Sequence, residues 1–237
     1  MFTSKPRRVV ITGASRGLGV EFTGQYLAAG AEVAALARTP EDSEALQELA
    51  RQHPGSLSLH ACDVADDDSV ARASDAIEDR WKGVDLLVNN AGVGGDGRKL
   101  LELDLAEWAR VFEVNAVGPV RVTRALLPLL RTGRKTVNAL ITSRMGSIAD
   151  NETGGAWAYR MSKAALNMAG RNMMHGLTYM GIRTYILHPG WVRTDMGGEQ
   201  APLAPAEAVQ ALVGTIDRLG REENGGFFDL NGDPLPW

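Results

Sequence analysis

The sequence predicts an α/β fold, in which one doubly wound parallel sheet of seven strands carries helices on both faces. Three observations predict it: short apolar segments recur along the chain, longer stretches with helical spacing lie between them, and a glycine-rich turn follows the first segment. A chain of 237 residues is within the size range of one such unit. We therefore expect residues 1–237 to form a single domain.

Seven short segments are the candidate strands. The first six are mostly continuous apolar runs rather than alternating apolar and polar residues, which is typical of strands covered on both faces. Such strands occur in parallel sheets enclosed by helices. The segments lie at residues 9–12, 32–37, 57–61, 85–88, 137–142, 184–187 and 227–230.

The stretches between these segments carry helix-start signals. Pro40 precedes a helix expected over residues 44–52, since proline is tolerated at a helix start. Asp66 opens a run of three aspartates at the positive end of the next helix. Two longer helical segments cover residues 115–130 and 159–179. Strands and helices thus alternate, which favours right-handed βαβ units.

Composition and charge exclude several classes of function. The net charge of −4 provides no field that would attract polyphosphate, so no nucleic-acid partner is expected. The four histidines have neither metal-ligand spacing nor an acidic partner, so we expect them to be incidental and the protein to bind no metal. The single cysteine, Cys62, cannot form an intrachain disulfide and lies where a buried thiol fits.

No apolar run approaches the ~18 residues of a membrane helix. The basic N-terminus is followed by only three apolar residues, too few for the core of a signal peptide. We therefore expect a cytoplasmic protein without membrane contact.

A glycine-rich turn connects the first predicted strand to a helix over residues 20–28. Residues 12–19 read Thr-Gly-Ala-Ser-Arg-Gly-Leu-Gly. Glycines at these places allow a tight turn and close approach of the backbone to a pyrophosphate, and the helix N-terminus adds N–H donors. A glycine turn without a ligand is the alternative. The residues expected to contact a dinucleotide here are Gly13, Ser15, Arg16, Gly17, Leu18 and Gly19.

The spacing Gly-x3-Gly-x-Gly resembles that of the short-chain dehydrogenase/reductase family, which implies a Rossmann-type fold and a nicotinamide cofactor. Asn-Asn-Ala-Gly at residues 89–92 looks like the family motif that steadies the central sheet and lies against the cofactor. The aspartate after the third strand resembles the family's adenine-contacting aspartate, with a polar strand cap as the alternative. The resemblance adds cofactor contacts from Asp63, Val64, Asn90, Ala91 and Gly92.

The charge near the ribose 2′ position decides between NAD and NADP. A carboxylate after the second strand binds the 2′-hydroxyl of NAD, whereas a cation accommodates the 2′-phosphate of NADP. The second strand here ends in Arg38 without an acid, and Arg16 lies in the glycine turn. Both guanidinium groups could face one phosphate, so NADP(H) is preferred, with NAD(H) as the alternative. Because 20 of the 25 basic residues are arginine, either arginine alone would be weak evidence for NADP.

Tyr159 and Lys163 form the candidate catalytic pair. Their i, i+4 spacing places phenol and ammonium on one face of a helix. An adjacent cation stabilises a phenolate, so we expect the pKa of Tyr159 to be lowered and the pair to act as a proton donor to a carbonyl oxygen. Such a pair can also be a solvated contact on any helix.

The family resemblance assigns further catalytic residues. Ser143, at the end of the fifth strand, resembles the serine that holds the substrate oxygen, although its separation from Tyr159 is a few residues longer than usual. Ser147 lies at a more usual distance in a less typical motif and is the rival. Asn115 matches the family's helix asparagine, which supports a water-linked proton relay to the lysine. A satisfied core amide or a helix kink is a compatible interpretation of Asn115.

The segment after the sixth strand resembles the Pro-Gly segment of the family. By this resemblance Thr194 binds the nicotinamide carboxamide, while Trp191 is interpreted as simple packing area. The cofactor contacts implied here are Pro189, Gly190, Val192 and Thr194, in addition to Tyr159 and Lys163.

Residues 154–168 and 225–237 look most like the branch of the family that contains C-factor signalling proteins and sniffer-type carbonyl reductases. This resemblance implies an NADP(H)-dependent oxidoreductase that reduces small aldehydes or ketones, or oxidises the matching alcohols, with Tyr159 as proton donor. The alternative is a cofactor-binding signalling or regulatory protein with incidental turnover. An intact proton donor weighs against that alternative, because binding alone does not require one.

Only ten residues separate Thr194 from Pro205, where relatives often carry a longer helical lid. We therefore expect an open site for apolar or aromatic carbonyl compounds. The glycine-rich loop at residues 92–97 is predicted to be mobile, and residues 94–99 form either a basic rim or a solvated loop.

Relatives often pair through the helices that correspond to residues 115–130 and 159–179, so the resemblance also implies a homodimer or homotetramer.

Overall fold

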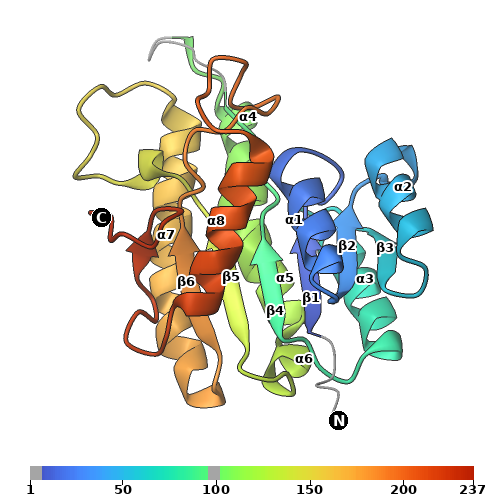
Figure 1. Ribbon diagram of the computed structural model, residues 1–237. Coiled ribbons are helices and arrows are strands. Elements are labelled where there is room, and N and C mark those ends of the chain that lie inside the picture. Colours follow the sequence, from blue (N-terminus) through green and yellow to red (C-terminus); the bar gives the residue numbers. More distant parts are fainter. Residues whose placement is uncertain (1–6, 96–101) are drawn as a thin grey trace.

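The computed structural model describes residues 7–95 and 102–237. Seven strands form one sheet in the order β3-β2-β1-β4-β5-β6-β7, and every neighbouring pair is parallel (Figure 1). The predicted doubly wound sheet is confirmed. The strands are β1 (Arg8–Thr12), β2 (Glu32–Ala37), β3 (Leu57–Ala61), β4 (Leu86–Asn89), β5 (Val137–Ile141), β6 (Arg183–Leu187) and β7 (Phe227–Phe228).

Helices alternate with these strands. They are α1 (Gly17–Ala28), α2 (Glu44–Gln52), α3 (Asp67–Arg80), α4 (Leu105–Phe112), α5 (Gly118–Ala125), α6 (Leu127–Arg131), α7 (Trp157–Leu177) and α8 (Pro205–Arg218). Short 3₁₀ turns lie at Pro40–Asp42 (η1), Arg144–Gly146 (η4) and Thr178–Met180 (η5), and Glu113–Val117 (η3) is π-helical. None of the helices in the described part of the chain is long and apolar enough to span a bilayer.

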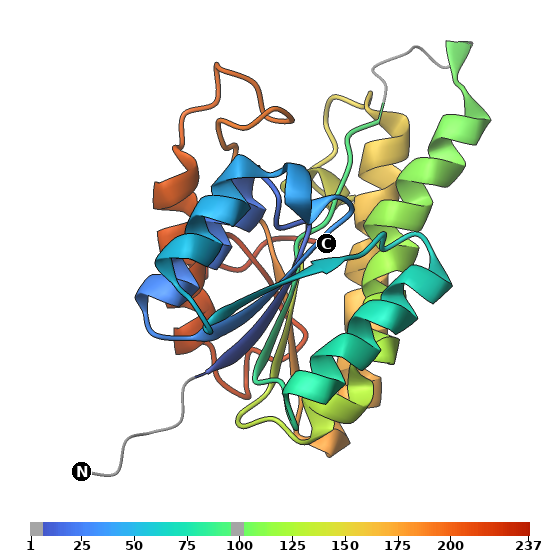
Figure 2. The same cartoon turned by 90° about the vertical axis from the view of Figure 1, so that its right-hand side faces the viewer.

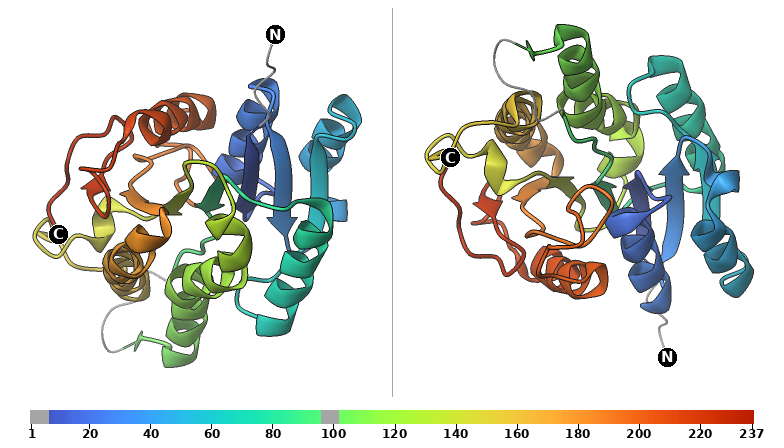
Figure 3. Two further views of the ribbon diagram at one scale, coloured as in Figure 1. Left: turned by 90° about the horizontal axis from the view of Figure 1, so that it is seen from below. Right: turned by 90° about the horizontal axis from the view of Figure 1, so that it is seen from above.

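Two helical layers enclose the sheet (Figures 2 and 3). Side chains of α1, α2 and α8 pack on one face, and those of α3, α5, α6 and α7 pack on the other. Both faces of the central strands are fully buried, as the continuous apolar runs predicted. The predicted burial of Cys62 is also confirmed.

Local hydrogen bonds explain where two of the helices begin. The Ser43 hydroxyl accepts from the Leu46 N–H and starts α2 at the predicted residue. The Asp66 carboxylate accepts from the Ser69 N–H and starts α3, again as predicted.

The predicted helix over residues 115–130 is interrupted twice. Proline has no N–H, so Pro119 cannot donate to the Asn115 carbonyl, and the chain forms the π-helical turn η3 at this point. There the Gly118 N–H donates to the Glu113 carbonyl five residues earlier. A second break separates α5 from α6 just before Pro128. The kink near Asn115 that the sequence indicated is therefore present.

Other predicted elements differ from the structure by one to three residues at their ends, among them the following two. The helix expected over residues 159–179 begins at Trp157 and leaves α-helical geometry after Leu177. The strand expected over residues 227–230 ends at Phe228, because the Asp229 carboxylate accepts from the N–H groups of Asn231 and Asp233 and closes a turn.

The order of the strands reverses between β1 and β4. Chain connections from these two strands run to opposite faces of the sheet, an arrangement that leaves a crevice at the carboxyl ends of the strands, which point upward in Figure 1. Most of the predicted site residues follow the carboxyl ends of strands.

Leu87 and Leu105 allow a matched test of the core. Leu87, in β4, is 0% exposed, whereas Leu105, at the start of α4, is 70% exposed. Leu87→Ala is expected to lower the free energy of unfolding by about 2–5 kcal/mol, because it leaves a cavity in close-packed surroundings. Leu105→Ala is expected to change it by less than about 0.5 kcal/mol. Urea unfolding measures both, and equal effects would contradict this description of the core.

Candidate active site

A hydrogen-bonded junction joins the carboxyl ends of β1 and β4. The Thr12 hydroxyl accepts from the N–H groups of Asn90 and Ala91, each at 3.0 Å. The Asn90 side-chain amide donates to the carbonyl oxygens of Thr12 (3.0 Å) and Gly13 (3.2 Å). The Asn-Asn-Ala-Gly segment is thereby held against the glycine turn.

The glycines of the turn stand where side chains would collide. A Cβ on Gly13 would lie 2.7 Å from the Cα of Ala91, and Gly13 has a φ of +63°. A Cβ on Gly19 would lie 2.0 Å from the Gly13 carbonyl oxygen. Gly17 packs on the Thr194 side chain, whose Cγ2 would lie 3.3 Å from a Cβ at this position. The turn, the Asn-Asn-Ala-Gly segment and the segment after β6 therefore surround one cradle, which suits a pyrophosphate.

Arg16 and Arg38 follow the ends of the adjacent strands β1 and β2. Arg16 precedes α1 directly, and its guanidinium donates to the Asp195 carboxylate at 2.8 Å. Both side chains of this pair are more than 70% exposed. Arg38 is exposed and makes no hydrogen bond or ion pair within residues 7–95 and 102–237. The neighbouring Ser15 is held through its carbonyl oxygen, which accepts from the Ser43 hydroxyl at 2.7 Å.

Asp63 and Val64 follow β3. The Asp63 carboxylate accepts from the Ala65 N–H at 2.9 Å, so the cap that the sequence offered as the alternative is formed. Val64 is buried, and its side chain packs against Gly118. Their contact with adenine stays a prediction.

Lys163 is buried in the interior of α7. Its ammonium donates to the Ile141 carbonyl at 3.0 Å and lies 5.8 Å from the centre of the Tyr159 ring. Burial lowers the pKa of Lys163 to about 8. The side chain also lies against Gly92, at which a Cβ would stand 3.6 Å from the Lys163 Nζ.

Tyr159 has the opposite pKa shift to the predicted one. Burial raises the pKa of the phenol, and a hydrogen bond with Ser143 lowers it by less. The expected lowering by Lys163 was wrong: that ammonium donates to the Ile141 carbonyl, and partial burial of the phenol has the larger effect on its pKa. Tyr159 is therefore a protonated phenol at neutral pH.

The two candidate serines have different surroundings. Ser143 lines the same cavity as Tyr159 and accepts from the Met145 N–H at 3.1 Å. Ser147 is buried outside this cavity, where its hydroxyl accepts from the Asp150 N–H at 3.1 Å. The turn η4, between the two serines, packs closely on α7, so that a Cβ on Gly146 would stand 2.7 Å from the Lys163 carbonyl carbon. Of the two serines, Ser143 is therefore the one that shares the cavity with Tyr159.

Asn115 is fully buried in η3. Its side-chain oxygen accepts from the Val93 N–H at 2.8 Å, and its amide donates to the Val93 carbonyl at 2.9 Å and to the Ser162 hydroxyl at 3.0 Å. Asn115 thereby ties the segment after β4 to α7, next to Lys163.

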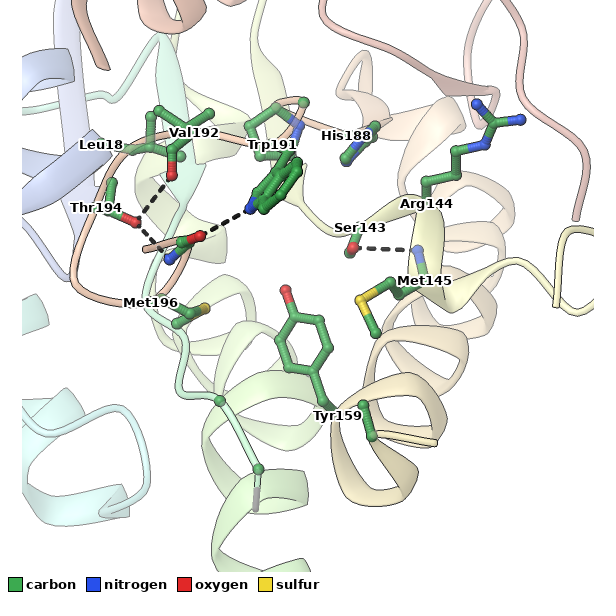
Figure 4. Close-up of a pocket in the computed structure, with 16 residues that line it drawn as sticks. Leu18, Ser143, Arg144, Met145, Tyr159, His188, Trp191, Val192, Thr194 and Met196 are labelled. Atoms are coloured by element: carbon green, nitrogen blue, oxygen red, sulfur yellow. Dashed lines mark hydrogen bonds between the residues drawn. The ribbon is translucent and has the colours of Figure 1, made fainter. Parts of the chain in front are cut away.

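A cavity of about 530 Å³ lies at the carboxyl ends of the strands. Figure 4 shows the Tyr159 hydroxyl pointing into it, between Ser143 and Met196. Its volume suits a small organic molecule. The other residues that line it are Leu18, Gly94, Gly95, Arg144, Met145, Ala156, His188, Pro189, Gly190, Trp191, Val192, Thr194 and Gly197.

The segment after β6 forms one wall of the cavity. The Trp191 indole N–H donates to the Gly197 carbonyl at 2.7 Å, and the side chain is 56% exposed rather than packed in the interior. The Thr194 hydroxyl accepts from the Gly197 N–H at 3.1 Å, which folds the segment into a tight turn (Figure 4). No helix forms between β6 and Pro205, so the predicted short lid is present.

Some predictions fall at the edge of the described chain. Gly94 and Gly95 line the cavity, whereas residues 96–99 of the predicted basic rim, and with them the end of the predicted mobile loop, lie outside the described residues. Within the described ranges, no group of three or more histidine, cysteine, aspartate or glutamate side chains could hold a metal ion.

Several residues of the site were not predicted, and three of them make up or line its central parts. Thr12 joins β1 to β4, Asp195 pairs with Arg16, and His188, which was expected to be incidental, lines the cavity. Each is adjacent in sequence to a predicted residue, namely Gly13, Thr194 or Pro189. That adjacency is the one signal that could have indicated them, since their partners are distant in sequence.

A family model described as short chain dehydrogenase matches residues 7–203. A curated relative, the C-signal of Myxococcus xanthus, is 53% identical over 154 residues, which is 65% of this chain and 93% of that protein.

Solved structures are similar over almost the whole chain. The carbonyl reductase Sniffer of D. melanogaster has a TM-score of 0.94 at 32% identity, covering 98% of this chain and 100% of that one. The NADPH-bound carbonyl reductase from chicken fatty liver has a TM-score of 0.93 at 33% identity, covering 99% and 100%.

Two glycines of α1 provide a matched test of the cradle. Gly19→Ala is expected to lower the free energy of unfolding by about 2 kcal/mol or more, because its Cβ would collide with the Gly13 carbonyl. A Cβ at Gly24 would meet only the Leu49 side chain, at an ordinary 3.7 Å. Gly24→Ala is therefore expected to raise the free energy of unfolding by up to about 1 kcal/mol. Thermal and urea unfolding compare the two, and a harmless Gly19→Ala would contradict the geometry of the turn.

Proposed function

This chain belongs to the short chain dehydrogenase family, an oxidoreductase family, and we propose that it is an NADP(H)-dependent carbonyl reductase. It reduces small aldehydes and ketones, or oxidises the matching alcohols, with Tyr159 as the proton donor. The observation that carries this proposal is the position of the Tyr159 hydroxyl, which points into a cavity of about 530 Å³ beside Ser143.

The cradle around the glycine turn supports the binding of a dinucleotide. Side chains are absent at Gly13, Gly17 and Gly19, where the backbone must come close to the phosphates. Arg38 and Arg16 support NADP(H) rather than NAD(H), because the residue directly after β2 is Arg38 and not a carboxylate. The similar chicken carbonyl reductase is described as NADPH-bound, which supports the same choice.

The chemistry divides between the cofactor and the protein. The bound nicotinamide cofactor supplies or accepts the hydride. Ser143 holds the carbonyl oxygen of the substrate with its hydroxyl, and Tyr159 transfers its phenolic proton to that oxygen as the alcohol forms. Burial raises the pKa of Tyr159, which keeps its proton available for reduction at neutral pH.

Lys163 resupplies the proton that Tyr159 has transferred, and Asn115 supports this step. The pKa of about 8 for Lys163, a result of burial, allows its ammonium to lose and regain a proton near neutral pH. Asn115 supports the water-linked relay to Lys163, because Pro119 has no N–H to donate to the Asn115 carbonyl. Thr194 and the neighbouring Pro189, Gly190 and Val192 would hold the nicotinamide end of the cofactor.

The relationship to C-signal favours a second candidate function. A protein with this name is 53% identical over 65% of the chain, which supports a signalling or regulatory role that uses the same cofactor cradle. Turnover would then be incidental. Binding of NADPH without reduction of any carbonyl compound would favour this second function.

Self-association and location complete the proposal. Exposed apolar side chains on η3, α5 and α7 support pairing through these helices, namely Val117, Val120, Met161 and Met168. A homodimer or homotetramer and a cytoplasmic location both stay predictions.

The central experiment measures NADPH oxidation by the purified protein with aldehydes, ketones and diketones. Tyr159→Phe is expected to lower kcat at least about 100-fold, because the site loses its proton donor. Ser143→Ala is expected to lower kcat by a comparable factor, since it removes a hydrogen bond to the reacting oxygen.

Ser147→Ala is the matched control, because it removes the same hydroxyl outside the cavity. It is expected to affect stability more than kcat. Unchanged turnover in Tyr159→Phe, or a larger loss of kcat in Ser147→Ala than in Ser143→Ala, would contradict the assigned roles.

The cofactor assignment has its own test. Arg38→Gln is expected to raise KM for NADPH about 10- to 100-fold and to change KM for NADH little, because only NADPH carries the 2′-phosphate. Arg16→Gln is expected to act in the same direction. The control is Arg51→Gln, on the exposed side of α2, where the guanidinium pairs with Glu48. Equal changes for both cofactors would reject the assignment.

A further inference from the structure

His188 lines the cavity and carries a polar atom without a hydrogen-bond partner among the described residues. It is the first residue after β6, and its side chain lies between Trp191 and Arg144, on the side where Ser143 also stands (Figure 4). This atom is the Nδ1, which is buried and makes no hydrogen bond within residues 7–95 and 102–237. A buried polar atom without a partner is costly, and such an atom in a binding cavity is satisfied when a ligand supplies the missing group.

The imidazole is uncharged at physiological pH. Burial lowers the pKa of His188 to about 4; the Asp229 carboxylate opposes this shift, and the Arg144 guanidinium adds to it. A neutral imidazole has one N–H and one free lone pair, and the tautomer decides which nitrogen carries the proton. His188 can therefore donate to a carbonyl oxygen or accept from a hydroxyl.

His188 and Ser143 follow the ends of neighbouring strands. Ile141 of β5 is paired with Leu187 of β6, and the Thr142 N–H donates to the Leu187 carbonyl at 2.8 Å. By this register His188 is level with Thr142, so the chain positions of His188 and Ser143 differ by one strand spacing, about 4.8 Å, and by one residue along the strands. A substrate whose carbonyl oxygen lies at Ser143 and Tyr159 would bring its neighbouring carbon toward His188.

The other side chains of this wall offer few hydrogen-bonding groups to a polar substituent of the substrate. Met145, Trp191 and Met196 contribute mainly apolar surface, and the Trp191 N–H is already used by the Gly197 carbonyl. Arg144 also lines the cavity, but its guanidinium donates to the Asp150 carboxylate at 2.6 Å.

We propose that His188 is a substrate-binding residue that hydrogen-bonds a second oxygen, carried on the carbon next to the carbonyl being reduced. The site then selects vicinal dicarbonyl compounds over simple aldehydes and ketones. The imidazole donates to the second carbonyl oxygen, which is not itself reduced, and the product is a 2-hydroxy ketone. This inference rests on the proposed reductase function and adds a residue that discriminates between its substrates.

The kinetic test compares 2,3-pentanedione with pentanal, two five-carbon substrates of which one has the second oxygen. Each variant is compared with the unaltered protein on the same substrate, so the intrinsic reactivities of the two compounds cancel. His188→Phe is expected to lower kcat/KM for the diketone about tenfold and for pentanal less than about twofold. His188→Asn, which keeps a side-chain N–H, is expected to restore most of the loss.

His175, an exposed histidine on α7, provides the matched control. His175→Phe is expected to leave both substrates unchanged. A purely structural role of His188 would lower kcat/KM for both substrates equally and would not be rescued by His188→Asn. Either that result or an unaltered diketone preference would overturn the proposal.

A binding measurement separates this inference from the reductase proposal. In Tyr159→Phe protein loaded with NADP⁺ and labelled with ¹⁵N-histidine, 2,3-pentanedione is expected to shift the imidazole nitrogen signals of His188, while pentanal is not. His188→Asn identifies those signals by their loss. A shift without NADPH oxidation in the unaltered protein would reject the reductase function but retain the binding role. Turnover of the diketone without a shift would reject the role of His188 alone.

Discussion

The reversal of strand order between β1 and β4 is the constraint on which the site depends. Two parallel strands whose connections leave toward opposite faces cannot both be covered at their carboxyl ends, and a crevice remains. The Thr12 hydroxyl and the Asn90 amide hold the two ends together with four hydrogen bonds. The same contacts bring the glycine turn to the Asn-Asn-Ala-Gly segment. The fold itself thus holds the glycine turn and the Asn-Asn-Ala-Gly segment of the cradle in place.

Burial shapes the chemistry of the groups around this crevice. Lys163 is buried and Tyr159 is partly buried, so the uncharged forms of both are favoured: the pKa of the phenol rises and that of the ammonium falls. The pKa of the Tyr159 phenol therefore lies above that of the Lys163 ammonium. His188 follows the same rule, since burial keeps its imidazole neutral. One physical effect thus accounts for the protonation state of each of these groups.

Part of the site could be predicted because its pattern is local. The apolar runs define strands covered on both faces, the glycine turn follows the first strand directly, and Tyr159 and Lys163 are one helical turn apart. The resemblance to the family then indicated Ser143 and Asn115. The structure brings Ser143 to Tyr159 and leaves Ser147 outside the cavity, a distinction that spacing along the chain could not make. The direction of the pKa shift of Tyr159 could not be predicted from the sequence either, because it depends on how far the neighbouring elements bury the phenol.

The sequence by itself determined the fold class, the place of the glycine turn, and the residue types of the candidate catalytic pair, since each depends on neighbouring residues or on a repeating period. Tertiary structure alone decided which distant groups meet. Asp195 lies 179 residues from its partner Arg16, and Thr12 lies 78 residues from Asn90. It also decided that His188 faces a cavity with a buried nitrogen left unpaired. The reason is physical: burial and partner choice depend on the packing of elements that are far apart in the chain, and local sequence carries no record of that packing.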